Sequence, residues 1–102
     1  MDRMEVQRDV RSAIAIAYEL SRHEHIQHNE NVAQALRELE AELARIEAKL
    51  GGEHAGEASA EGLQPSLQHV KAVLDDAGPV VADQIKALLN SVERISKELV
   101  AR

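Results

Sequence analysis

Leucine, isoleucine and valine recur along this chain at alternating spacings of four and three residues, and one glycine-rich segment, 51–62, interrupts them. Before that segment the clearest run is Val32, Leu36, Leu39, Leu43, Ile46 and Leu50. After it the run is Leu63, Leu67, Val70, Leu74 and Ala77, continued by Val81, Ile85, Leu88, Val92, Ile95 and Leu99. Such spacing places the apolar side chains on one face of a helix. The pattern therefore predicts two amphipathic helical arms, about 2–50 and 63–101, joined by a flexible segment.

The N-terminal arm carries two lines of side chains at helical spacing. The first line is apolar and consists of Val6, Val10, Ala13, Ala17 and Leu20. The second line consists of Met4, Ala15, Tyr18, Arg22 and Ile26. Residues 12–20 are apolar around much of the helix, which is typical of a helix that is covered from more than one side. One partner helix cannot cover both lines, so we expect the second line to meet another surface.

A further interruption stands within the C-terminal arm, at Gly78–Pro79. The residue before a proline avoids the helical conformation, which favours a break at this point. The apolar spacing nevertheless continues on nearly the same face beyond it. We expect a kink in the second arm, the alternative being two separate helices that pack against the same surface.

The length of the first arm bears on how the chain assembles. A single helix over residues 2–50 is about 70 Å long, roughly twice the width of a small domain. A hairpin of two such arms buries too little surface to be stable alone. We therefore expect a long antiparallel helical hairpin that dimerises into a four-helix bundle. The alternative is a compact monomer whose first arm breaks near Asn29–Asn31, with Asn31 capping a new helix and Gln34 completing the capping box.

The composition supports an all-α protein and limits what it can bind and where in the cell it is found. The chain holds one tyrosine and no phenylalanine, tryptophan or cysteine, so its core is built from aliphatic side chains and it contains neither disulfides nor thiolate metal sites. The formal net charge of −6, with dispersed basic residues, argues against nucleic-acid binding. The absence of a long apolar run argues against a signal peptide or a membrane span. We expect a cytoplasmic protein that binds neither nucleic acid nor membrane.

Three of the five histidines lie in the segment 22–28, where the first arm turns polar. On a helix, Glu24, His25 and His28 share one face, at spacings that let two side chains bind one ion. Two first arms that cross antiparallel bring two copies of these residues together, which allows a zinc or nickel site between subunits. The competing interpretations are a polar layer that sets helix register, a solvated interruption, or a break in the helix.

The sequence gives little support for catalysis. The serines lack the context of a catalytic nucleophile, and Gly51–Gly56 follows a helix and lacks the lysine of a nucleotide-binding loop. We therefore expect no enzyme activity and no cofactor. The hypothesis we favour is a protein-interaction module of the adaptor, chaperone-like or inhibitory regulatory kind, a homodimer that binds another protein through Met4, Ala15, Tyr18, Arg22 and Ile26. The alternative hypothesis is a metal-binding or metal-responsive bundle that uses Glu24, His25 and His28.

Overall fold

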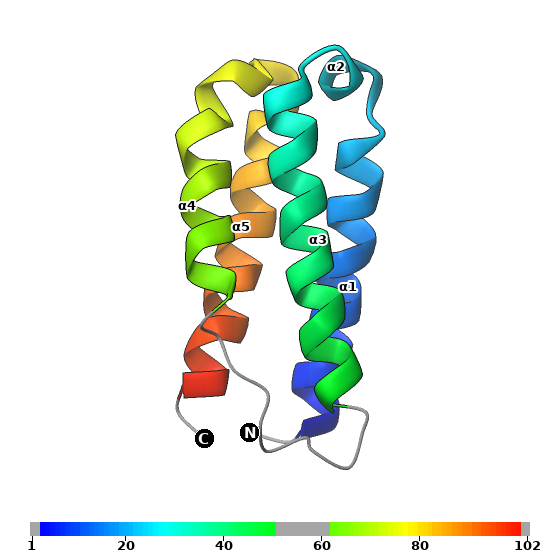
Figure 1. Cartoon of the computed structure of the whole chain (residues 1–102), viewed down its shortest axis with the longest axis vertical. Helices are drawn as coiled ribbons and strands as arrows, with labels where there is room; N and C mark the ends of the chain where they lie inside the picture. Colours follow the sequence, from blue (N-terminus) through cyan, green and yellow to red (C-terminus); the bar gives the residue numbers. More distant parts are fainter. Residues whose placement is uncertain (1–2, 51–61, 101–102) are drawn as a thin grey trace.

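The computed structural model describes residues 3–50 and 62–100. Its helices are, in chain order, α1 (Arg3–Ser21), α2 (Glu24–Gln27), α3 (Glu30–Leu50), α4 (Leu63–Val73), the short 3₁₀ helix η2 (Leu74–Ala77) and α5 (Pro79–Val100). The four long helices α1, α3, α4 and α5 stand side by side and alternate in direction (Figure 1). One chain thus supplies all four helices of a compact bundle that measures 40 × 19 × 19 Å. The all-α prediction is confirmed, whereas the long two-helix hairpin is wrong.

The core of the bundle consists of the apolar stripes that the spacing predicts. Every residue of the run from Val32 to Leu50 is at most 1% exposed. The first line of α1 is buried as well, at Val6, Val10, Ala13, Ala17 and Leu20. From the C-terminal half the core takes Leu63, Leu67, Val70, Ala77, Val81, Ile85, Leu88, Val92, Ile95 and Leu99, while Leu74 is only partly buried. The helices therefore associate through aliphatic side chains, as the composition requires.

The first predicted arm is broken between Ser21 and Glu30, and Ile26 explains the path that the chain takes there. Ile26 is fully buried although it lies on the single turn α2 at the end of the bundle. The chain must leave the axis of α1 to bring this side chain over the core. Asn29 then starts the next helix, because its Oδ1 accepts a 3.4 Å hydrogen bond from the backbone N–H of Val32. The continuous helix over 2–50 is therefore wrong, and the alternative of a compact bundle whose first arm breaks near Asn29–Asn31 is confirmed. The cap, however, is Asn29 rather than Asn31.

The second predicted arm is also broken, at Gly78. The backbone of Gly78 has φ = +82°, a conformation that favours glycine. It ends η2 and starts α5, where the N–H of Ala82 donates a 3.1 Å hydrogen bond to the carbonyl of Gly78. The chain reverses direction here, so α4 and α5 are separate antiparallel helices and the expected kink is wrong (Figure 1). The apolar spacing continues because both helices face the same core.

The side chain of Asn29 ties the two turns together at this end of the bundle. Its Nδ2 donates a 2.9 Å hydrogen bond to the carbonyl of Asp76 in η2. The same residue therefore caps α3 and holds the connection between α4 and α5. The predicted joint, 51–62, connects the helices at the opposite end and, apart from Gly62, lies outside the described residues.

The substitution Gly78→Ala is expected to lower the free energy of unfolding by about 1–2 kcal/mol, because an L-residue pays a steric penalty at this φ. A Cβ at this position meets no atom within 4 Å, so the loss reports backbone conformation rather than a clash. Urea denaturation measures it, with the exposed position Asn90 replaced by alanine as the control. Equal stability of the two variants would contradict the assigned backbone conformation.

Ion pairs on the surface join each helix to its neighbours around the bundle. They are Arg11–Glu47 at 2.7 Å between α1 and α3, Glu38–His69 at 2.8 Å between α3 and α4, Lys71–Glu93 between α4 and α5, and Arg94–Asp9 at 3.9 Å between α5 and α1. Hydrogen bonding to His69 lowers the pKa of Glu38, and hydrogen bonding to Lys71 lowers the pKa of Glu93. Because these groups are at least partly open to solvent, the pairs contribute little stability.

Candidate functional site

The structure separates the five residues of the predicted partner-binding line. Met4, Ala15 and Tyr18 lie on the exposed face of α1, with Met4 72% and Tyr18 45% exposed, and the exposed Arg22 directly follows the helix. Ile26 does not belong to this surface, because it is buried at the end of the core. The helical spacing that links Ile26 to Arg22 in the sequence ends where α1 ends. The exposed line therefore runs only from Met4 to Arg22.

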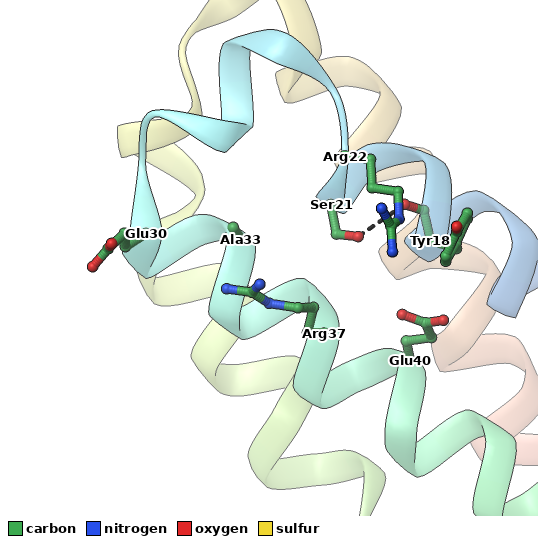
Figure 2. Close-up of a pocket in the computed structure, with 7 residues that line it drawn as sticks. All are labelled: Tyr18, Ser21, Arg22, Glu30, Ala33, Arg37 and Glu40. Atoms are coloured by element: carbon green, nitrogen blue, oxygen red, sulfur yellow. Dashed lines mark hydrogen bonds between the residues drawn. The ribbon is translucent and has the colours of Figure 1, made fainter.

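A groove lies beside the C-terminal end of this line, between α1 and the first half of α3. Its volume is about 430 Å³. Figure 2 shows its lining, in which α1 provides one wall and α3 the other. The residues that line it are Tyr18, Ser21, Arg22, Glu30, Ala33, Arg37 and Glu40. The buried Ala33 lets the groove form, because its methyl group leaves space that a longer side chain would fill.

The α1 wall of the groove is held in place by contacts within the helix. The guanidinium carbon of Arg22 lies 4.5 Å from the centre of the Tyr18 ring, a cation–π contact. The hydroxyl of Ser21 donates a 2.8 Å hydrogen bond to the backbone carbonyl of Tyr18. The aromatic ring and the guanidinium are thus positioned together before any ligand arrives. Pre-positioned side chains lose less conformational entropy on binding.

The charged side chains of the groove are not paired with each other. Arg22, Glu30, Arg37 and Glu40 form no ion pair with any residue in the described ranges 3–50 and 62–100. Farther along the same two helices, Arg11 and Glu47 do pair, at 2.7 Å. The groove therefore presents two positive and two negative groups that remain available to a ligand.

A second hollow of about 430 Å³ lies near the other end of α1. It is lined by Met4, Glu5, Gln7, Arg8 and Arg11, all from this one helix. Its walls are side chains of neighbouring turns, whereas two helices build the α1–α3 groove. We therefore take the α1–α3 groove as the candidate site.

Sequence reasoning found the α1 wall of the groove and missed the α3 wall. In the sequence, Arg37 and Glu40 lie among many other charged residues of the same helix and do not stand out. The pairing of Arg11 with Glu47 fixes the antiparallel register of the two helices. Seven residues on from Arg11 and seven back from Glu47, this register puts Tyr18 level with Glu40. The sequence alone does not give this register, because it depends on where the first arm breaks.

The predicted metal ligands lie on and beside α2. Glu24 and His28 are exposed, and the side chain of His25 lies outside the described part of the structure. Among the described side chains, no three His, Asp or Glu residues are grouped so that they could hold a metal ion. Because α1 and α3 are separate helices, the crossing of two long first arms that the zinc or nickel site requires does not arise. Metal binding by Glu24, His25 and His28 stays a prediction without further support.

Comparisons of the chain with protein-family models, with curated proteins and with solved structures gave no match. None of the helices in the described ranges is long and apolar enough to cross a membrane.

Proposed function

We propose that this protein is a non-enzymatic interaction module that binds another protein through the groove between α1 and α3. The observation that supports this proposal best is the arrangement of Tyr18 and Arg22 at the groove. Tyr18 is 45% exposed, and Arg22 stacks on its ring. Tyrosine and arginine, together with tryptophan, are enriched at the energetic centre of protein interfaces.

The exposure of Tyr18 supports a partner on physical grounds. It is the only aromatic residue of the chain, yet it is excluded from a core made of aliphatic side chains. Covering an aromatic ring removes a large apolar area from water, which stabilises a complex. Exposed Ala15, next to Tyr18 on the same face, allows close approach of a partner backbone. A partner can therefore cover the ring of Tyr18 and approach the backbone of α1 closely at Ala15.

The unpaired charges of the groove supply selectivity. A partner that places groups of opposite sign against Arg37 and Glu40 gains charge-assisted contacts, whereas one with mismatched charges leaves them unpaired. The only hydroxyl groups of the lining are those of Ser21 and Tyr18, and Ser21 donates to a backbone carbonyl. These features suit recognition rather than chemistry. They fit the adaptor, chaperone-like or inhibitory class of binding protein.

Site-specific photo-crosslinking tests the proposal. A benzophenone side chain placed at Tyr18 is expected to form an adduct with a partner in cells that make the protein. The same group at Asn90, exposed on α5, is expected to form none. The substitution Arg22→Glu should abolish the adduct from position 18, because it removes the cation beside the crosslinker. No adduct at position 18, or equal adducts at both positions, would overturn the proposal.

A further inference from the structure

We propose that the α1–α3 groove binds a second copy of this chain, in a two-fold symmetric dimer in which Arg37 of each copy pairs with Glu40 of the other. The inference rests on the proposed function only in using the groove as an interface. It names the occupant, which the proposed function leaves open. This dimer differs from the one predicted from the sequence, in which two hairpins together formed one four-helix bundle. Here one chain already completes the bundle, and two bundles associate through their surfaces.

The signs of the charges favour a second copy over a partner of one sign. The groove is lined by Arg22 and Arg37 and by Glu30 and Glu40. An acidic partner meets two carboxylates there, and a basic partner meets two guanidinium groups. In a two-fold interface the same patch faces itself, so that residue i meets residue j and j meets i. A patch with both signs is complementary to itself under this symmetry when the axis passes between a positive and a negative group.

The arrangement within α3 shows that Arg37 and Glu40 are available for such pairing. They stand three residues apart, a spacing at which Glu42 and Arg45 of the same helix do pair, at 3.0 Å. Arg37 instead extends toward Ala33, while the carboxylate of Glu40 points toward Tyr18 (Figure 2). The two groups thus point along the groove in opposite directions. A two-fold axis between them brings each opposite the unlike group of the second copy.

Tyr18 provides the apolar part of this contact. It lies on the α1 wall beside Glu40, close to where the axis must pass (Figure 2). The neighbouring exposed positions Ala15 on α1 and Ala41 and Ala44 on α3 are small, so the two surfaces can approach closely. Because the apolar area is modest and the charges are exposed, we expect a reversible dimer that added salt weakens.

Charge reversal, alone and in mixtures, tests the dimer. Light scattering after size-exclusion chromatography at low salt is expected to show a concentration-dependent dimer of the native chain. In a dimer of Arg37→Glu two carboxylates face each other, and in a dimer of Glu40→Arg two guanidinium groups do, so each variant alone should be monomeric. An equimolar mixture of the two variants should form a heterodimer, because the charges that face each other across it can again be opposite. Changes confined to the fold of one chain cannot produce this rescue.

Two controls accompany the mixture. Lys86→Glu, an exposed charge reversal on α5, should leave the dimer intact, and circular dichroism should show unchanged helix content in every variant. A native chain that stays monomeric at high protein concentration would overturn the inference. Single variants that remain dimeric, or a mixture that remains monomeric, would also overturn it.

The outcome is separable from that of the proposed function. If the mixture fails while position 18 crosslinks to a different protein, self-association fails and the proposed function stands. If the mixture succeeds and the adduct from position 18 has twice the mass of the chain, both proposals stand and the protein bound at the groove is a second copy of the chain. If the mixture succeeds but position 18 forms no adduct, the dimer stands and the proposed function fails.

Discussion

The substitution Ile26→Ala is expected to lower the free energy of unfolding by about 2–5 kcal/mol, the range for truncating a fully buried aliphatic side chain. Ile26 has no exposed surface, although it belongs to a turn of only four residues at the end of the bundle. Removing its side chain leaves a cavity over the core and takes away what holds α2 in place. The loss should appear in urea denaturation as a lower midpoint.

Tyr18→Ala is the matched comparison for this prediction. Sequence spacing places Tyr18 and Ile26 on one line, but Tyr18 is 45% exposed. Surface substitutions of this kind change the free energy of unfolding by roughly 0.5 kcal/mol or less. The two variants should therefore differ by several-fold in their effect on stability, and only Tyr18→Ala should weaken binding at the groove. Similar stability losses in both variants would contradict the placement of Ile26 in the core.

Replacing residues 22–29 by eight residues of high helix propensity is expected to convert the compact monomeric bundle into an intertwined dimer. With the break removed, α1 and α3 form one helix about 70 Å long. The apolar stripe of α3 can then no longer fold back on α1 of its own chain. It must be covered by α1 of a second chain, the exchange known as domain swapping. At high salt, which weakens the groove dimer, light scattering should report twice the mass of one chain, and small-angle scattering an elongated particle.

This fused-helix variant must be told apart from the groove dimer. An intertwined dimer depends on the aliphatic core, so it should persist at low protein concentration and at high salt. It should also persist when Arg37→Glu is added, a change expected to make the native chain monomeric. A fused-helix variant that remains a compact monomer would show that the bundle closes without the sequence of the turn.

The apolar stripes were predictable because leucine spacing determines which helix face is buried. The break between Ser21 and Glu30 was predictable only as an alternative, near Asn29–Asn31, because residues 21–31 contain neither proline nor glycine and Ile26 continues a helical spacing. Burial of Ile26 and capping by Asn29 decide the path there, and both depend on tertiary contacts. At Gly78–Pro79 the local signal for a break was present. The apolar spacing continues beyond this point, which favoured a kinked helix. Two antiparallel helices that pack on one core show the same continuous spacing.

Only half of the candidate groove was accessible to sequence reasoning. Tyr18 and Arg22 share a helix face, so their proximity follows from spacing alone. Arg37 and Glu40 are distant in the chain, and their approach to Tyr18 depends on the turn at α2. Without the position of that turn, the register between α1 and α3 is undefined. To predict a site that two helices build, one must know which face of each helix is exposed and where the chain turns between them.

The bundle closes so that the start of α1 and the end of α5 lie at the same end as the end of α3 and the start of α4 (Figure 1). Closely packed helix pairs also run across the two halves of the sequence, α4 against α3 and α5 against α1. The order of the halves along the backbone is therefore not what holds them together. A circular permutant that begins at Gly62, runs through α5 and re-enters at α1 preserves every helix and every neighbour. In such a permutant the α1–α3 groove stays within one uninterrupted stretch, which becomes the C-terminal half of the chain.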